Sequence, residues 1–165
     1  MSNTKCIHVY GIVQGVGFRP YISRLANKYK LMGTVSNKGP YVEIYIQGAE
    51  DAMDAFQEDL EPCAPARAAI LETDIEEVEH AAFHGFDIIE SHREKGTIFV
   101  SPDIAICDKC KEELYNKSDR RYLHPFINCT ACGPRLTILD SMPYDRERTS
   151  MGEFPMCEKC RYEYT

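Results

Sequence analysis

The chain has 165 residues, of which 44% are hydrophobic and 27% are charged, and its 19 Lys/Arg and 26 Asp/Glu give a formal net charge of −7 at pH 7. Zinc proteins that bind nucleic acid normally carry a basic surplus that neutralises phosphates, so this charge disfavours nucleic acid as a partner. No apolar run approaches the roughly 20 residues that span a bilayer, and the N-terminus MSNTKCIHVYG has no apolar signal segment, so we expect a cytoplasmic protein without a membrane partner.

Strand and helix patterns alternate through the first ninety residues. The strand candidates are rich in β-branched and aromatic residues, and they lie at 5–13, 32–37, 41–47, 67–79 and 83–90. Two amphipathic helices lie between them, one from Pro20 to about Lys30 and one at about 50–60. The four residues from Asn37 to Pro40 form a strong turn signal between the second and third strands. This order predicts an α+β fold, the ferredoxin-like βαββαβ arrangement with one short extra strand.

Each of these elements has one apolar face, and together the faces predict the core. In the third strand apolar residues alternate with polar or aromatic ones, as expected of a sheet with one buried face. In both helices the apolar residues recur at helical spacing. The predicted core residues are Ile7, Val9, Val13, Ile22, Leu25, Ala26, Tyr29, Val42, Ile44, Ile46, Met53, Phe56 and Leu60.

A glycine-rich segment, GIVQGVGFR from Gly11 to Arg19, leaves the first strand and enters the first helix. Gly15 and Gly17 permit backbone conformations in which successive N–H groups converge on an anion, and the helix N-terminus adds a favourable dipole. Arg19 offers a planar fork that matches phosphate oxygens. The segment therefore predicts a phosphate cradle, with a tight turn followed by a surface arginine as the alternative.

Three Cys-x-x-Cys pairs follow in the second half of the chain. Two of them are separated by eighteen residues, the spacing of a four-cysteine zinc site, and their members are Cys107, Cys110, Cys129 and Cys132. Four ligands close the coordination sphere, so we expect the zinc ion to be structural. The third pair, Cys157 and Cys160, is half of a second zinc site and suggests a missing continuation. Metal shared with a neighbouring chain, or free thiols, are the alternatives for this pair.

Eight cysteines without an export signal favour metal ligands over disulfides, because the cytosol keeps thiols reduced. A disulfide framework and an iron–sulfur cluster are the alternatives. Cys6 and Cys63 lie outside the pairs and are expected to be ordinary packed or surface thiols. His124 could be a substitute ligand, but four thiols suffice, so a packing or hydrogen-bonding role is expected. An anion site or an exposed charged face could be formed by Arg120, Arg121 and Arg135.

The glycine-rich segment resembles the acylphosphatase signature G-x-V-Q-G-V-x-[FY]-R, which is the catalytic loop of that family. Asn37, at the end of the segment GTVSN, matches the family's second catalytic position. The resemblance covers about residues 5–90 and implies hydrolysis of a carboxyl–phosphate anhydride. Asn37 would orient the attacking water, although a turn asparagine in a left-handed conformation is the alternative. The substrate phosphate would be bound by the loop residues Gln14, Gly15, Val16, Gly17, Phe18 and Arg19.

The chain as a whole resembles the N-terminal part of the HypF-type carbamoyltransferases, which are maturation factors of nickel–iron hydrogenases. The loop, the three cysteine pairs and the segments from Ser101 to Asp103 and from Thr130 to Arg135 carry this resemblance. It implies an acylphosphatase-like domain at 1–91, a linker at 92–106 and a zinc-finger region at 107–165. The first finger, 107–132, would be complete, and the second would begin at 157 and be truncated.

The same resemblance implies a function. The domain would hydrolyse carbamoyl phosphate as the first step of carbamoyl transfer to the partner protein HypE, which makes the cyanide ligands. A carbamoyl adenylate made by domains absent from these 165 residues would carry the group, so full transfer activity is not expected from them. The alternatives are a stand-alone zinc-stabilised acylphosphatase, a nucleic-acid-binding zinc protein and a non-catalytic zinc-containing interaction module.

Overall fold

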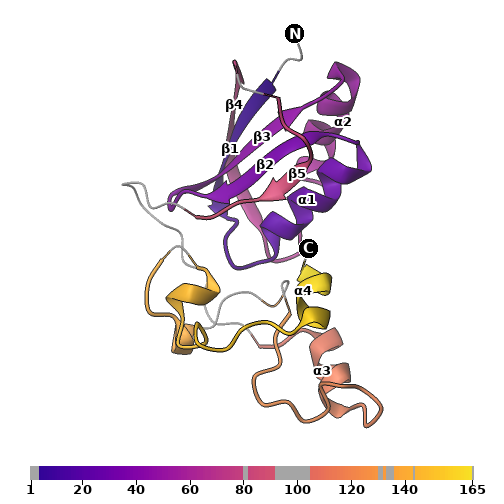
Figure 1. Cartoon of the computed structure of the whole chain (residues 1–165), viewed down its shortest axis with the longest axis vertical. Coiled ribbons are helices and arrows are strands. Elements are labelled where there is room, and N and C mark those ends of the chain that lie inside the picture. Colours follow the sequence, from indigo (N-terminus) through magenta and orange to yellow (C-terminus); the bar gives the residue numbers. More distant parts are fainter. Residues whose placement is uncertain are drawn as a thin grey trace.

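A five-stranded sheet covered on one face by two helices forms the first part of the protein (Figure 1). The computed structural model describes residues 4–79, 82–91, 105–129, 132, 136–142 and 144–164. The elements of this part are β1 (Thr4–Ile12), α1 (Phe18–Lys28), β2 (Met32–Asn37), β3 (Tyr41–Gln47), α2 (Glu50–Leu60), β4 (Ala69–Val78) and β5 (Phe86–Ile88). This order confirms the predicted βαββαβ arrangement and its short extra strand.

The strand order is β4-β1-β3-β2-β5. The pairs β1–β3, β1–β4 and β2–β3 are antiparallel, and β5 adds a parallel edge beside β2. The register places Val9 opposite Val42, and Val42 opposite Asn37. The end of β2 therefore lies at the same level of the sheet as the stretch of β1 that leads into the glycine-rich loop.

The β1 strand is irregular where it approaches that loop. Its register against β4 shifts between Tyr10 and Gly11. Gly11 has φ +131°, and a Cβ there would lie 2.1 Å from the carbonyl oxygen of Ala69. Only glycine meets both conditions, because L residues rarely adopt this φ and no side chain fits the space. The irregularity directs the chain from the end of β1 into the loop.

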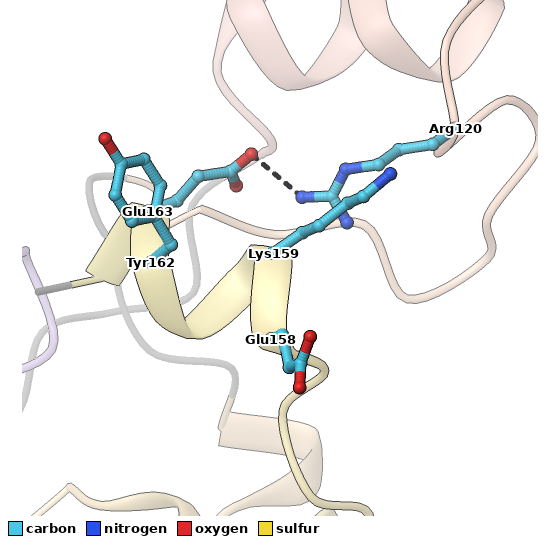
Figure 2. Close-up of a pocket in the computed structure, with 5 residues that line it drawn as sticks. All are labelled: Arg120, Glu158, Lys159, Tyr162 and Glu163. Atoms are coloured by element: carbon cyan, nitrogen blue, oxygen red, sulfur yellow. Dashed lines mark hydrogen bonds and ion pairs between the residues drawn. The ribbon is translucent and has the colours of Figure 1, made fainter.

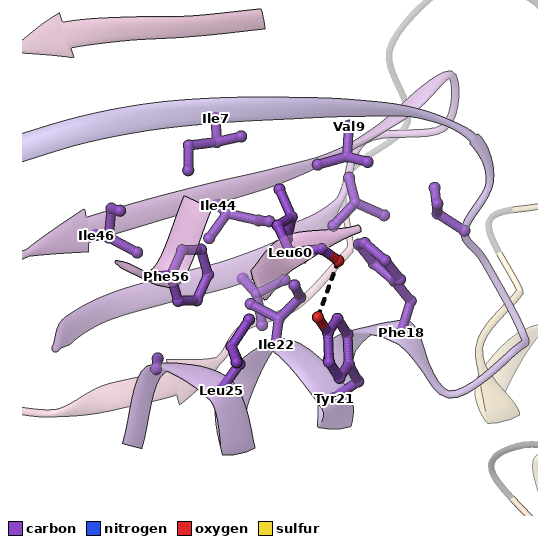
Figure 3. Close-up of a cluster of buried hydrophobic side chains, with 14 of the residues drawn as sticks. Ile7, Val9, Phe18, Tyr21, Ile22, Leu25, Ile44, Ile46, Phe56 and Leu60 are labelled. Atoms are coloured by element: carbon purple, nitrogen blue, oxygen red, sulfur yellow. Dashed lines mark hydrogen bonds between the residues drawn. The ribbon is translucent and has the colours of Figure 1, made fainter. Parts of the chain in front are cut away.

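The core lies between the sheet and the two helices, as the apolar faces predict. Figure 3 shows side chains from the strands, such as Ile44 and Ile46, packed against Phe56 of α2 and Ile22 of α1. Each of these four side chains is fully buried, which stabilises the fold by about 1.5–3 kcal/mol per residue. Tyr29, also predicted for the core, is only partly buried at its edge.

Tyr21 links the two helices within this core. Its hydroxyl lies 2.9 Å from the carbonyl oxygen of Leu60 and 2.9 Å from that of Asp59, both at the end of α2. A helix end leaves carbonyls without intrahelical partners, so the hydroxyl gives the Leu60 carbonyl a partner and adds a second one to the Asp59 carbonyl, which also accepts from the amide of Cys63. Burial, with the neighbouring thiol and carboxyl groups, raises the pKa of the Tyr21 phenol.

The cysteine-rich part follows and lies beyond one end of the sheet (Figure 1). Its elements are α3 (Asp108–Tyr115), two single 3₁₀ turns at Leu136–Ile138 and Arg146–Arg148, and α4 (Glu158–Tyr164). Helix α4 has no counterpart among the predicted elements. A small core forms around Cys110, Ile127 and Cys132.

Two arginines of the first part reach into the second. Arg67, between α2 and β4, donates from Nη2 to the carbonyl oxygen of Ala105 at 2.9 Å and from Nη1 to that of Cys132. Arg19 donates to Asp145 at 2.6 Å. Most of the predicted linker, residues 92–104, lies outside the described residues, so the domain boundaries stay predictions. Within the described part, no helix is long and apolar enough to cross a membrane.

Candidate active site and metal centre

The glycine-rich loop joins β1 to α1. Gly15 and Gly17 have φ values of +73° and +76°, in the left-handed region that glycine adopts without strain. Val16 and Phe18, between and after them, are buried in the core and anchor the loop. Alternation of this kind turns backbone N–H groups toward one side, which makes an anion-binding concavity at the start of a helix. The two positive φ values directly before α1 are compatible with a phosphate cradle, which stays a prediction.

Arg19 is the second residue of α1, directly beside this loop. Its Nη1 donates to the hydroxyl of Ser91 at 3.1 Å, and its Nη2 donates to Oδ1 of Asp145 at 2.6 Å. The Arg19 and Asp145 side chains are each only 14% exposed, so solvent screens their ion pair weakly. Nothing in the sequence pattern predicts these two partners, because they lie 72 and 126 residues further along the chain.

Asn37 is the last residue of β2 and is fully buried. Neither its Oδ1 nor its Nδ2 has a hydrogen-bond partner among the described residues. A buried polar group left unpaired costs about 1–3 kcal/mol, so an unpaired buried amide is rare in a structural position. Asn37 does not have a positive φ, and Gly39, at +98°, makes the left-handed turn instead. The alternative of a left-handed turn asparagine is therefore wrong.

Gln14 holds the loop and the turn after Asn37 together. Its Nε2 donates to the carbonyl oxygen of Gly39 at 2.6 Å, and its Oε1 has no partner among the described residues. Thus two amide side chains with unpaired buried oxygens, Gln14 and Asn37, belong to the two segments that this hydrogen bond joins. The roles predicted for these residues stay predictions, but their positions suit a polar ligand.

The four cysteines of the first two pairs lie together. The Sγ atoms of Cys107 and Cys129 are 3.8 Å apart, and Cys132 Sγ lies 3.6 Å from those of Cys129 and Cys110. A tetrahedron with metal–sulfur bonds of about 2.3 Å has edges of about 3.8 Å, so these separations suit one tetrahedral ion. All four sulfurs lie within 4.8 Å of one another, and the cluster can hold a metal ion.

The surroundings of the sulfurs differ. Burial raises the pKa of Cys110 far above its usual value. Burial acts in the same direction on Cys132, but the backbone N–H groups of Cys107 and Cys129 outweigh it and lower the pKa of Cys132 to about 7. The Cys107 amide nitrogen lies 3.3 Å from Cys132 Sγ. Amides directed at sulfur favour the thiolate, the form that binds metals.

Cys157 and Cys160 lie outside this cluster, at the start of α4. Arg120 Nη1 is 3.4 Å from Cys160 Sγ and 3.9 Å from Cys157 Sγ. The backbone N–H of Cys160, followed by its side chain and by the charge of Arg120, lowers the pKa of Cys157. Figure 2 shows the shallow pocket here, where Arg120 reaches toward Glu163. Half of a second metal site stays a prediction for this pair.

The other residues singled out beside the cysteines have ordinary partners. Arg120 pairs with Glu163 at 2.8 Å, and Arg121 pairs with Glu113 at 3.0 Å and also with Glu163. Arg135, the third member of the anion site considered above, lies outside the described residues. His124 accepts a 3.2 Å hydrogen bond at Nδ1 from the amide of Phe126. The expected hydrogen-bonding role of this histidine is confirmed.

Comparison with known proteins agrees with both sites. Residues 5–88 match the Acylphosphatase family, and residues 106–139 match the HypF finger. The probable carbamoyltransferase HypF of Methanocaldococcus jannaschii is 51% identical over 86% of this chain and 19% of its own length. The carbamoyltransferase HypF of a Synechocystis species is 42% identical over 93% of this chain and 20% of its own length.

A solved structure gives the same result. The crystal structure of full-length HypF in its phosphate- and nucleotide-bound form superposes with a TM-score of 0.92 and 44% identity, over 99% of this chain and 22% of that one. The chain thus spans about a fifth of the length of these relatives. The chain therefore belongs to the acylphosphatase family through residues 5–88 and, with the HypF finger that follows, matches the N-terminal region of HypF-type carbamoyltransferases.

Proposed function

We propose that the first part of this protein hydrolyses an acyl phosphate, and that carbamoyl phosphate is its substrate. The observation that carries the proposal is the fully buried amide of Asn37, which has no partner among the described residues. It lies two residues before Gly39, whose carbonyl oxygen accepts a hydrogen bond from Gln14 of the Arg19 loop. A phosphate in the cradle and a water beside it would supply the missing partners. Membership of the acylphosphatase family supports the reaction class.

The chemistry needs positioning more than covalent help. The loop from Gln14 to Arg19 holds the phosphoryl oxygens, and the guanidinium of Arg19 balances the charge that builds on them. Asn37 accepts a hydrogen bond from the attacking water at Oδ1 and aims the water oxygen at phosphorus. The new oxygen–phosphorus bond forms as the bond to the acyl oxygen breaks, and the electron pair leaves with the carbamate. The substrate phosphate takes the water's proton, so no general base is required.

In the longer relatives this step would precede transfer. We propose that the carbamoyl group passes through a carbamoyl adenylate, made with ATP elsewhere in such a protein, to a cysteine of HypE for the cyanide ligands of a nickel–iron hydrogenase. The support is the similarity to carbamoyltransferases named HypF. The 165 residues of this chain should perform the hydrolysis and not the transfer.

We further propose that the metal of the four-cysteine cluster is zinc, bound by Cys107, Cys110, Cys129 and Cys132. Four thiolates at tetrahedral separations suit Zn²⁺, and a closed set of four protein ligands leaves no position for substrate. The ion would supply cohesion to the finger and take no part in hydrolysis. Cys157 and Cys160 would contribute to a second zinc site.

The test is phosphate release from carbamoyl phosphate by the native chain, Arg19→Ala and Asn37→Ala. We expect each variant to lose roughly a hundredfold or more in kcat, as when an oxyanion-stabilising group is removed. Arg24→Ala is the matched control, because Arg24 is an exposed arginine of the same helix. Equal rates for native protein and Arg19→Ala would overturn the assignment. An inactive native chain that still binds phosphate would instead favour the non-catalytic interaction module.

A further inference from the structure

The partner of Arg19 belongs to a structured loop of the finger region. Leu139 and Thr149 form an antiparallel bridge at the base of the loop, and the amide of Ser150 donates to the carbonyl oxygen of Ile138 at 2.9 Å. The amide of Asp140 donates to the carbonyl oxygen of Arg148 at 2.9 Å. Asp145 lies between these closing contacts, directly before the turn Arg146–Arg148. Its position is therefore fixed by backbone hydrogen bonds within the loop.

The Asp145 carboxylate is shared by two arginines. Its Oδ1 lies 2.6 Å from Arg19 Nη2, and its Oδ2 lies 2.8 Å from Arg148 Nη1. Arg148 holds the carboxylate in place from within the finger region, and Arg19 receives it from the first part of the protein. A carboxylate and a phosphate are bound by a guanidinium in the same way, through charge-assisted N–H···O bonds. Asp145 thus occupies one of the outer nitrogens with which Arg19 would bind a phosphate.

We propose that Asp145 is a built-in competitor of the phosphate for Arg19, supplied by the finger region. A phosphoryl group entering the cradle displaces the carboxylate from Arg19, and the carboxylate returns when inorganic phosphate leaves. Two anions against one guanidinium repel each other in a partly buried site, so the two cannot share Arg19 without loss of affinity. Asp145 therefore weakens anion binding and speeds phosphate release. It acts on Arg19 and is not itself a catalytic residue.

This inference rests on the proposed phosphate cradle and adds a second function to the finger. A contact that served only stability would not need to occupy the arginine that is proposed to bind phosphate. The same ion pair also makes anion affinity depend on how the finger packs against the first part. The finger region thus sets the affinity of a site whose other residues all precede it in the chain.

The experiment compares the full native chain with Asp145→Asn, which keeps the shape and removes the charge. Inorganic phosphate is titrated by calorimetry, and kcat and KM are measured with carbamoyl phosphate. We expect the phosphate Kd and the KM to fall roughly tenfold in Asp145→Asn, the effect of removing one charge-assisted competitor. Glu147→Gln, an exposed carboxylate of the same turn, should leave both constants at native values. Asp145→Glu keeps the negative charge, so its phosphate Kd and KM should lie closer to the native values than those of Asp145→Asn.

The outcomes separate this inference from the proposed function. Phosphate binding of equal strength in the native chain and Asp145→Asn would overturn the inference and leave the cradle standing. Phosphate binding in neither protein would overturn the cradle itself, and the inference with it. If Asp145→Asn does not fold, Asp145→Ser replaces it, with the same expected fall in Kd, and an unchanged or raised Kd overturns the inference.

Discussion

Gln14 Nε2 and the carbonyl oxygen of Gly39 form a 2.6 Å hydrogen bond that joins the two halves of the candidate active site. Gln14 opens the loop that leads to Arg19, and Gly39 lies in the turn that follows Asn37. The bond is buried, so breaking it would expose neither group to water. One glutamine therefore joins the glycine-rich loop to the turn beside Asn37, and so links the two segments proposed to bind phosphate and to orient water.

Gln14→Met is expected to impair hydrolysis more than it impairs folding. The side chain keeps its approximate shape but loses its donor, which leaves a buried carbonyl unpaired at a cost of about 1–3 kcal/mol. The loop should then move relative to Asn37, and kcat/KM for carbamoyl phosphate should fall roughly tenfold to a hundredfold. Gln57→Met is the matched control, because Gln57 makes a comparable 2.9 Å bond to Met53 within α2. Equal kinetic losses in both variants would show that the Gln14 bond has no special role.

Gly11→Ala is expected to destabilise the protein by about 2–4 kcal/mol in a denaturant titration. The new Cβ would meet the Ala69 carbonyl oxygen at 2.1 Å, and the backbone would keep a φ of +131° that alanine rarely adopts. The strand irregularity that leads into the loop would have to change. Gly85→Ala is the control and should cost less than about 0.5 kcal/mol, because a Cβ there meets no atom within 4 Å.

The sheet, both its helices and the glycine-rich loop between β1 and α1 could be predicted because their signals are local. Alternation in β3 fixes which of its side chains are buried, and nine consecutive residues from Gly11 to Arg19 carry the loop signature. The same local spacing groups the four cysteines of the metal cluster. In each case the information lies within one segment or in a fixed interval between two segments.

The partners of Arg19 could not be predicted in this way. Asp145 stands 126 residues from Arg19, in a loop without a motif, and meets it only because the finger packs against the first part. Ser91 follows the short strand β5, and its contact depends on how that strand joins the sheet edge. Helix α4 has only seven residues, too few for an apolar period to be recognised.

Stability should fall between pH 9 and 11, partly because of Cys6. Burial, opposed by a hydrogen bond with Tyr45 and reinforced by nearby carboxylates, raises the pKa of this thiol from 9.0 to about 11. An acid whose pKa is raised in the folded state keeps its proton there while the unfolded chain loses it, so stability declines as pH rises through this window. The decline from this group approaches 2–3 kcal/mol, at about 1.4 kcal/mol per pH unit.

Cys6→Ala should remove that part of the decline. Denaturant titrations at pH 8 and pH 10.5 are compared for the two proteins, and the free energy of unfolding should drop less in the variant. Cys63→Ala, which removes an exposed thiol, is the control. The same drop in native protein and Cys6→Ala would refute the role of the buried thiol.

Removal of the metal is expected to lower stability and, at the same time, to strengthen phosphate binding. The cysteine cluster forms the core of the finger together with Ile127, and metal binding supplies much of the folding energy of such small modules. Without the ion, the Cys132 carbonyl should leave Arg67, and the loop carrying Asp145 should no longer be held against Arg19.

A chelator under reducing conditions should therefore lower the Tm and reduce the phosphate Kd toward that of Asp145→Asn. In Asp145→Asn the chelator should lower the Tm by as much as in the native chain. The phosphate Kd of this variant should not change, because the competing carboxylate is already absent. A metal-free chain with lowered Tm and native phosphate affinity would show that the metal-stabilised finger does not control Arg19.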